Sequence, residues 1–106
     1  WSIYNGAEDA KQVQAQANHP TIRLFHILRS GSELPQERGE GNWEACTPEA
    51  MARFSSVGYF FGRKLQENLN VPIGLINASW GGTPGEVWVP EDDINNDAAL
   101  KEAASR

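Results

Sequence analysis

The hydrophobic pattern of the first part of the chain predicts a helix followed by a buried strand. Residues 7–17 are rich in good helix formers, with Asn5 as the expected cap and two acids in the first turn. Asn18–Pro20 ends this helix, because a residue before proline is disfavoured in the α conformation. Residues 21–28 (TIRLFHIL) carry apolar side chains on both faces, which predicts a strand covered on both sides.

The next stretch, residues 30–42, contains glycines, a proline and three glutamates but has no apolar period. It predicts a long surface loop over about residues 30–43. Loops of that length within a compact domain are usually functional or mobile.

A long helix is predicted next, because Thr47, Pro48 and Glu49 form a strong start signal. Its apolar positions recur at spacings of three and four and define one face that we expect to point at a core. The positions on this face are Met51, Phe54, Gly58, Phe61, Leu65 and Leu69. Asn70 and Pro72 predict its end.

The last part of the pattern predicts a second strand and sets the fold class. Residues 72–78 (PIGLINA) are nearly all apolar, which is typical of a buried parallel strand, and a helix is expected from about Asp97 within residues 91–106. Strand, helix and strand in this order predict a parallel crossover and therefore an α/β fold. Two parallel strands are too few for an independent sheet, so residues 1–106 are interpreted as an interior portion of one larger domain.

Composition excludes several classes of protein. The 106 residues carry nine Lys and Arg against fourteen Asp and Glu, a net charge of −5, which argues against a nucleic-acid partner. No apolar run approaches the roughly 20 residues of a membrane span. A single cysteine, Cys46, allows neither an internal disulfide nor a thiolate zinc site, and we expect it to be a small buried filler. The sequence begins at Trp1 rather than Met, which suggests a processed or cut chain.

Candidate chemistry gathers in the turn after the second strand, where ligands bind in open α/β sheets. Gly81 and Gly82 allow a sharp bend that presents backbone N–H groups to an anion, although a plain tight turn explains two glycines equally well. Trp80 and Trp88 fit sugar stacking or burial in a core about equally. No cofactor fingerprint is present.

A serine nucleophile within this chain is the alternative. Asn77-Ala78-Ser79-Trp80-Gly81 resembles the G-x-S-x-G nucleophile elbow, but Asn77 stands where the motif requires glycine. The motif also needs a downstream histidine, whereas His19 and His26 both lie upstream. We expect His19 to be a loop or capping residue and His26 to be a core side chain.

Four segments in order resemble the sialate O-acetylesterases, carbohydrate esterases of the SGNH-hydrolase superfamily. They are ANHPTIRLF (17–25), the Trp43-x-x-Cys46 pair, FSSVGYFFGRKL (54–65) and VPIGLINASWGGTPGEVW (71–88). The resemblance covers residues 1 to roughly 90. It implies a flavodoxin-like three-layer α/β/α fold and hydrolysis of acetyl esters on sugars, typically sialic acid. It further implies that no metal or organic cofactor is needed and that the protein is secreted or periplasmic.

The resemblance also locates the expected site. The family's G-Q-S-N-M nucleophile motif and its D-x-x-H block are both absent from this chain, so no catalytic residue is assigned. The resemblance places Ser55 and Gly58 near the oxyanion, and it places a second lining block at Gly81, Gly82 and Thr83. Glu86 and Trp88 lie close behind this block and are expected to shape the pocket. Together with Trp80, which could stack on a sugar ring, they are the expected substrate-binding residues.

We therefore expect an O-acetylated sugar as the partner of the intact enzyme, and no esterase activity from this chain alone. A small non-catalytic carbohydrate-binding or interaction module is the alternative, and an α/β-hydrolase piece that uses Ser79 is a further one. Both predicted strands would expose apolar faces and edges without their neighbours, so we also expect association or swapping between chains.

Overall fold

The computed structural model describes residue 2 and residues 8–106. The chain forms two compact units. We call Trp1–Leu28 with Arg38–Ser79 the sheet unit, and Arg29–Glu37 with Trp80–Arg106 the turn unit. Each is described separately below.

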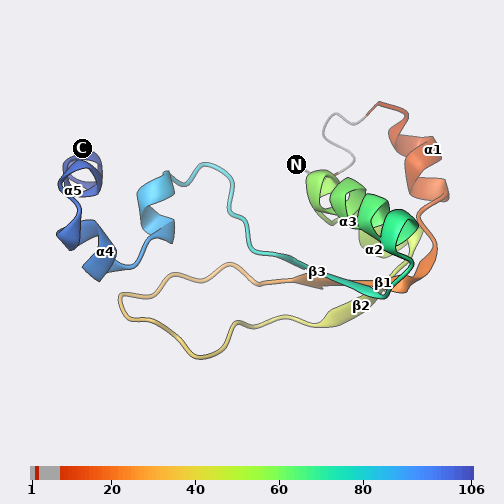
Figure 1. Ribbon diagram of the computed structural model, residues 1–106, viewed down its shortest axis with the longest axis horizontal. Helices are drawn as coiled ribbons and strands as arrows, with labels where there is room; N and C mark the ends of the chain where they lie inside the picture. Colours follow the sequence, from red (N-terminus) through yellow and green to blue (C-terminus); the bar gives the residue numbers. More distant parts are fainter. Residues whose placement is uncertain (1, 3–7) are drawn as a thin grey trace. The chain divides into compact units, whose positions relative to one another are not determined.

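The sheet unit is built on three strands in the order β2-β1-β3 (Figure 1). β1 (His19–His26) is central and pairs parallel with β3 (Ile73–Asn77), which confirms the predicted parallel crossover. β2 (Trp43–Cys46) pairs antiparallel with β1. The sequence analysis missed β2, because four residues are too few to show a clear alternation.

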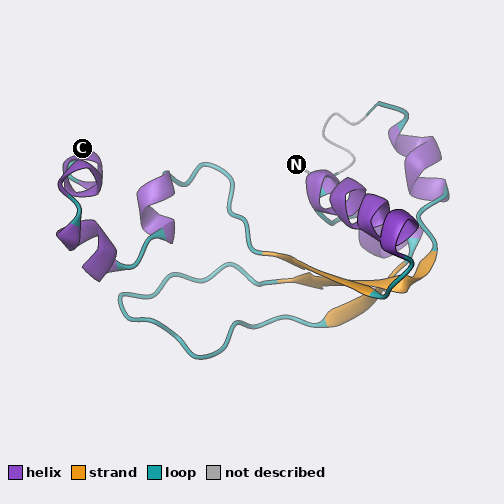
Figure 2. Cartoon of the chain, viewed as in Figure 1, coloured by secondary structure: helices purple, strands orange, loops and turns teal. Residues whose placement is uncertain are grey.

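Three helices belong to this unit (Figure 2): α1 (Ala10–Ala15), α2 (Pro48–Ala52) and α3 (Ser56–Leu69). The predicted start of α2 is confirmed, because the Thr47 hydroxyl accepts a hydrogen bond from the Ala50 N–H at 3.2 Å and proline follows at the first helical position. The predicted end of α3 at Asn70 is also confirmed. Asn70 adopts the left-handed conformation, with φ of 51°, that terminates many helices.

The first helix is shorter than predicted. It begins after Asp9, which has a left-handed φ of 54° and whose side chain makes no capping bond, so the two acids precede the first turn. The expected cap, Asn5, lies outside the described residues.

The single long helix predicted after Thr47 is wrong, because the chain breaks it into α2 and α3. Ser55 has extended backbone and its hydroxyl accepts from the Gly58 N–H at 3.1 Å, so it caps a new helix. Because α3 starts anew at Ser56, a different set of its residues faces the core than the single long helix would present. The buried residues of α3 are Ser56, Tyr59 and Gly62, whereas Phe61 and Leu69 are mainly exposed.

The core lies between α3 and one face of the sheet. A Cβ at Gly62 would come within 2.5 Å of Leu75 Cδ1, so the absence of a side chain lets helix and strand approach closely. The buried cluster comprises Ala17, Ile22, Leu24, Cys46, Ala50, Met51, Phe54, Tyr59 and Leu75. α2 contacts β2, and α1 packs on α2. The predicted α/β class, as a partial fold with parallel strands, is confirmed.

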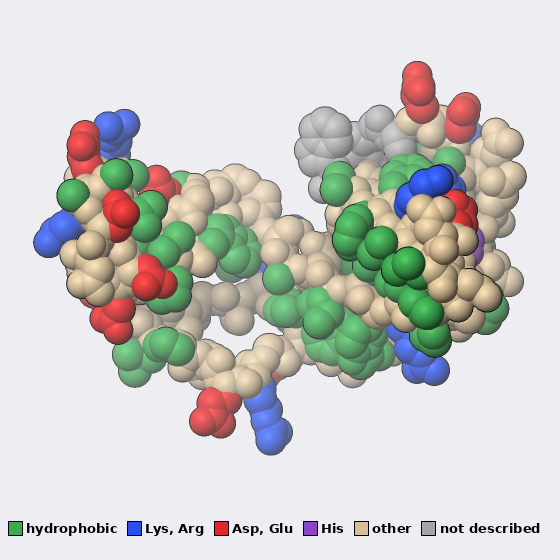
Figure 3. All heavy atoms as spheres, in the orientation of Figure 1, with side chains coloured by type: hydrophobic (Ala, Val, Ile, Leu, Met, Phe, Trp, Pro, Cys, Tyr) green, Lys and Arg blue, Asp and Glu red, His purple; other side chains and the backbone are tan. Residues whose placement is uncertain are grey.

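The expectation that both strands are covered on both sides is wrong for the described residues. Ile22 and Leu24 of β1 are buried, but Arg23 between them is exposed, and Ile76 of β3 is 62% exposed beside buried Leu75. Figure 3 shows apolar side chains gathered on the surface of this unit, over α3 and the sheet.

The turn unit contains short helices: a 3-10 turn, η2 (Gly85–Trp88), followed by α4 (Glu91–Asn96) and α5 (Ala98–Ala104). The predicted helix start at Asp97 is confirmed, because its carboxylate accepts from the N–H groups of Ala99 and Leu100. No residue of this unit is buried. Across the described part of the chain, no helix combines the length and apolarity needed to cross a membrane.

Candidate functional site

The carboxyl ends of β1 and β3 lie side by side in the sheet unit. His26 is paired with Asn77 in the parallel register, and the Ile27 N–H donates to the Asn77 carbonyl at 3.1 Å just beyond the last pair. Ligands of open α/β sheets bind at this edge.

The N-terminus of α3 forms a second element of the same region. Ser55 and Gly58, both predicted to line the site, are joined by the capping bond described above. Because the Gly58 N–H already donates to Ser55 Oγ, it is not available to a ligand while the cap is in place. The first turn of a helix nevertheless concentrates N–H groups and partial positive charge, which favours an anionic oxygen nearby.

A hollow of about 300 Å³ brings these two elements together. It is lined by Phe54, Ser55, Gly58 and Phe61 from the helix side and by Gly74, Leu75, Ile76 and Asn77 from β3. Of the predicted lining residues, Ser55 and Gly58 therefore share one wall of a cavity at the end of a parallel strand.

Ser79, the alternative nucleophile, is exposed and donates a hydrogen bond to Asn77 Oδ1 at 2.8 Å. An amide oxygen is not a base that could accept the proton of an attacking serine. Neither histidine is hydrogen-bonded to Ser79. His19 is bonded to the Tyr59 hydroxyl, and the His26 ring contacts the Phe54 ring at a centroid separation of 6.3 Å. The structure thus shows, among the residues it describes, no base in hydrogen-bond contact with the Ser79 hydroxyl.

Both histidine expectations are wrong. His26 is the last residue of β1 and is exposed rather than part of the core. His19 is the first residue of β1, and its Nε2 lies 2.9 Å from the Tyr59 hydroxyl on α3. This contact ties the start of the central strand to the covering helix.

Cys46 lies in the buried core, as expected, with 1% of its surface exposed. Burial raises the pKa of its thiol, and a backbone hydrogen bond from His19 opposes that rise. Burial likewise raises the pKa of Tyr59, opposed by the nearby Arg63. Both groups are therefore neutral at physiological pH and serve packing rather than nucleophilic chemistry.

In the turn unit, the predicted glycine turn is held by a relay of hydrogen bonds. The Trp88 indole N–H donates to Thr83 Oγ1 at 2.9 Å, and the Thr83 hydroxyl donates to the Trp80 carbonyl at 2.6 Å. Gly82 has a φ of +81°, a conformation that residues with a side chain rarely adopt. Trp80, Gly82, Thr83 and Trp88 thus form one connected structure, in which both tryptophans are about half exposed and neither belongs to a core.

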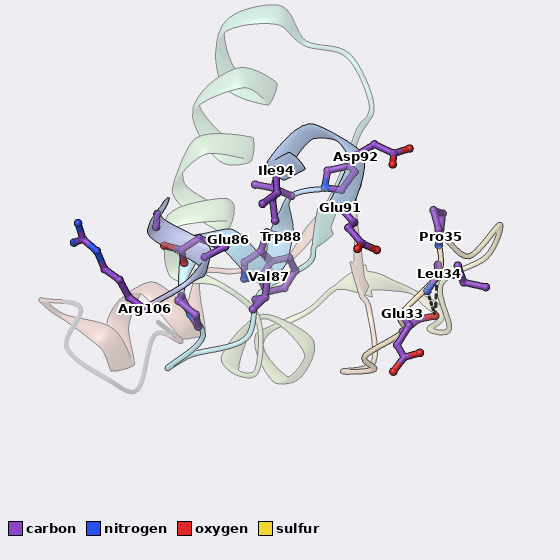
Figure 4. A pocket seen from close by; sticks show the side chains of 16 residues that line it. Glu33, Leu34, Pro35, Glu86, Val87, Trp88, Glu91, Asp92, Ile94 and Arg106 are labelled. Carbon is purple, nitrogen blue, oxygen red and sulfur yellow. Dashed lines mark hydrogen bonds between the residues drawn. The ribbon is translucent and has the colours of Figure 1, made fainter. Parts of the chain in front are cut away.

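Glu86 and Trp88 line a larger hollow, of about 1020 Å³, within the turn unit (Figure 4). Its walls combine apolar side chains such as Val87 and Ile94 with the carboxylates of Glu33, Glu91 and others. An exposed aromatic ring beside carboxylates is a common arrangement for binding sugar hydroxyls and ring faces.

The sequence analysis missed Arg29. Its guanidinium carbon lies 6.0 Å from the centroid of the Trp80 ring, which is a cation–π contact between two exposed side chains. A signal was present: Arg29 follows β1 by three residues, as Trp80 follows β3 by three residues. Among the described residues, no group of three His, Cys, Asp or Glu side chains is placed to hold a metal ion.

The parallel strands β1 and β3 end side by side, next to the capped N-terminus of α3. This arrangement defines an α/β protein whose ligands are expected at the carboxyl ends of the strands. The comparisons with known proteins narrow this class. The sialate O-acetylesterase of Homo sapiens is 59% identical over 94 residues, and that of Rattus norvegicus is 32% identical over 94 residues. The chain belongs to the sialate O-acetylesterase family. No protein-family model matches it.

A solved structure, described as a novel carbohydrate acetylesterase from Xanthomonas citri, superposes on this chain with a TM-score of 0.82 at 37% identity. The alignment covers 94% of this chain and 23% of that one. The two sequence alignments each cover 81% of this chain and 17% of the relative. The chain thus spans less than a quarter of the length of each of these proteins.

Proposed function

We propose that this chain forms part of a carbohydrate O-acetylesterase of the SGNH-hydrolase type, which hydrolyses acetyl esters on sialic acid or related sugars. The observation that supports it most is the likeness to the solved carbohydrate acetylesterase, because it extends over nearly the whole chain in both sequence and structure. The position of the 300 Å³ hollow, at the carboxyl end of β3, fits the same proposal.

The proposed reaction is acyl transfer. A serine, activated by a histidine, attacks the acetyl carbonyl carbon and forms a tetrahedral oxyanion. Collapse of this intermediate expels the sugar oxygen, which takes the proton from the histidine and becomes a hydroxyl, and water then releases acetate from the acyl-enzyme. In this proposal both catalytic residues come from outside these 106 residues, so the chain alone has no esterase activity.

The contribution of this chain would be the oxyanion environment and the walls of the pocket. The first turn of α3 is a suitable donor, because Ser55 occupies the Gly58 N–H but the Val57 N–H has no acceptor within the helix. Developing negative charge there is stabilised by the helix N-terminus. The exposed Trp88 ring and the Glu86 carboxylate would bind the sugar, through stacking and hydrogen bonds to hydroxyls.

The family resemblance further leads us to propose that the protein acts outside the cytoplasm, in a secreted or periplasmic form. A signal-peptide fusion assay, with secretion of the full gene product as the readout, tests this separately from activity. Retention of the full gene product inside the cell would contradict it.

A chimera tests the enzymatic proposal. Residues of this chain would replace the 94 matching residues of the human relative, and hydrolysis of 4-nitrophenyl acetate and of an O-acetylated sialic acid would be measured. We expect the chimera to keep activity within about tenfold of the parent, since a properly placed segment should cost at most about 1.4 kcal/mol of transition-state stabilisation. The isolated chain should give no hydrolysis above a buffer blank.

One substitution, Ser79→Ala, serves as the control in both the chimera and the isolated chain. Ser79→Ala should leave the chimera active, because Ser79 bonds an amide oxygen rather than a base. Robust turnover by the isolated chain that Ser79→Ala abolishes would replace this proposal with the nucleophile-elbow alternative. A folded chimera that binds substrate but has lost all hydrolysis would show that this segment is not equivalent to that of the relative.

The exposed apolar surface of the sheet unit leads to one further proposal, that the isolated chain self-associates. Val57, Phe61 and Leu69 lie on the solvent side of α3, and each is more than half exposed. Light scattering of the isolated chain should show dimers or larger species. A monodisperse monomer at high protein concentration would disprove self-association.

A further inference from the structure

We propose that Arg29 recognises a carboxylate on the substrate, and that the turn unit therefore selects acidic over neutral sugars. This inference rests on the proposed function, because it assigns a specificity to the same substrate. It concerns a residue to which neither the sequence motifs nor the family resemblance gave a role.

The first observation is that Arg29 has a stacking partner but no acidic partner. Its guanidinium packs over the Trp80 ring, and among the residues described it makes no ion pair. Three other arginines, Arg53, Arg63 and Arg106, each pair with a glutamate. Arg23 and Arg38 also lack an ion pair in the described chain, but neither packs on a tryptophan. In a chain of net charge −5, an exposed guanidinium without a carboxylate partner is available to an external anion.

The second observation is that the backbone of the stacking residue, Trp80, is held in place. Trp80 opens the glycine turn, and its carbonyl accepts from Thr83, whose hydroxyl in turn accepts from Trp88. A guanidinium that lies over an aromatic ring keeps its N–H edge directed outward. That edge forms a planar fork which matches a carboxylate with two parallel hydrogen bonds.

The third observation is the place of both residues in the chain. Arg29 follows β1 and Trp80 follows β3, each by three residues, and the ends of these two strands are paired at His26 and Asn77. Segments that leave adjacent parallel strands at their carboxyl ends are the ones that contact ligands in open α/β sheets. The predicted substrate residues Trp80, Glu86 and Trp88 belong to the same turn unit as Arg29.

Carboxylate recognition also accounts for selectivity between sugars. The carboxylates around the large hollow, including Glu33, Glu86 and Glu91, accept hydrogen bonds from hydroxyls but repel a negative group. An acidic sugar bound by this unit therefore needs a cation to offset this field. Arg106 lines the hollow but is paired with Glu102, whereas Arg29 belongs to the same unit, lies outside the lining of the hollow and has no ion pair among the described residues.

The test uses two ligands that differ only at the carboxyl group: N-acetylneuraminic acid, which is charged, and its neutral methyl ester. Each is titrated into the full 106-residue chain, with tryptophan fluorescence and NMR amide shifts as readouts. We expect the acid to bind about 10- to 100-fold more tightly than the ester, as for a hydrogen-bonded charge pair. Arg29→Gln should remove this preference while leaving the affinity for the ester unchanged, and Arg29→Lys should restore only part of it.

Arg53→Gln is the matched control, since it removes one exposed arginine whose partner is Glu44. It should leave the preference for the acid intact. Equal affinity for acid and ester in the wild-type chain, or the same loss in Arg53→Gln as in Arg29→Gln, would overturn the inference. Absence of binding by either ligand, combined with unchanged selectivity of the chimera below, would also overturn it.

The chimera with the human relative separates this inference from the proposed function. With the O-acetylated acid and its O-acetylated methyl ester as substrates, Arg29→Gln should raise KM for the acid at unchanged kcat and leave the ester unaffected. Equal loss on both substrates would refute a role in carboxylate recognition while leaving the esterase proposal intact. An inactive chimera whose isolated segment still prefers the acid would refute the esterase proposal and support Arg29.

Discussion

The two units of the chain differ in what holds them together. Every buried side chain of the described chain belongs to the sheet unit, where α3 covers one face of β1 and β3. The turn unit has no buried residue and relies on caps, a stacked Arg29–Trp80 pair and the bonds through Thr83. Most of the predicted substrate residues lie in the turn unit. Binding elements are often drawn from the least stable parts of a fold, and the contrast here follows that rule.

The contrast is tested most strongly by truncating one leucine in each unit. Leu24 on β1 is 2% exposed, whereas Leu34 in the turn unit is 72% exposed. Leu24→Ala should lower the free energy of unfolding by about 2–5 kcal/mol, through lost burial and an internal cavity. Leu34→Ala should change it by less than about 0.5 kcal/mol. Urea denaturation followed by circular dichroism measures both, and similar losses would show that the turn unit shares the core.

A smaller effect is expected where the helix meets the strand. Gly62→Ala places a Cβ within 2.5 Å of Leu75 Cδ1, so overpacking should cost about 1–3 kcal/mol. Gly81→Ala in the turn unit meets no atom within 4 Å and should be nearly neutral. Thermal unfolding compares the two. A more stable Gly62→Ala variant would mean that Leu75 yields easily and that helix propensity outweighs the contact.

Removing a helix cap should also affect the sheet unit more than the turn unit, with a loss of about 1 kcal/mol in the free energy of unfolding for the sheet unit. Thr47 caps α2, whose residues Ala50 and Met51 are buried, so Thr47→Ala should lower global stability by about 1 kcal/mol. Asp97 caps α5, which has no buried residue, so Asp97→Ala should reduce helicity there without moving the global transition. Hydrogen exchange resolved by residue distinguishes a local from a global loss.

The smallest expected change in stability occurs only at alkaline pH, where Cys46 and Tyr59 of the sheet unit ionise. Burial raises the pKa of Cys46 above its ordinary 9.0 and that of Tyr59 above its ordinary 10.0. The unfolded chain therefore loses these protons first, so the contribution of these two groups to stability is fully present below about pH 9 and is lost as pH rises through the folded pKa values. Denaturation between pH 7 and 11 should show this decline. Cys46→Ala should delay its onset, and an unchanged onset would assign the effect to Tyr59.

Much of the sheet unit could be predicted from the sequence, because its signals are local. The cap at Thr47, the stop at Asn70 and the apolar run of β3 each depend on a few neighbouring residues. The pairing of β2 with β1 was missed, because it joins segments on either side of the long loop. The buried face of α3 was predicted wrongly, because one hydroxyl, that of Ser55, restarts the helix and shifts its phase.

The candidate site divides in a similar way. Motifs pointed to the glycine turn and to Ser55, whose positions follow from chain order alone. The capping bond that occupies the Gly58 N–H and the stacking of Arg29 on Trp80 required coordinates, because both depend on side-chain direction. The sequence could identify the segments that lie near the carboxyl ends of the strands. It could not show which of their N–H groups and side chains already make contacts within the chain.

The strand order β2-β1-β3 has a consequence for the time course of folding. Neither neighbour of β1 is adjacent to it in sequence: β2 follows the long loop, and β3 follows α2 and α3. The chain must therefore close one long connection for each partner of its central strand, and two before that strand is paired on both sides, which opposes rapid assembly. Helix α3 forms from local contacts and can precede both closures. We expect a slow refolding phase whose rate is limited by the packing of β1 against an already formed α3. During this phase the apolar strands of a newly synthesised chain would be unpaired.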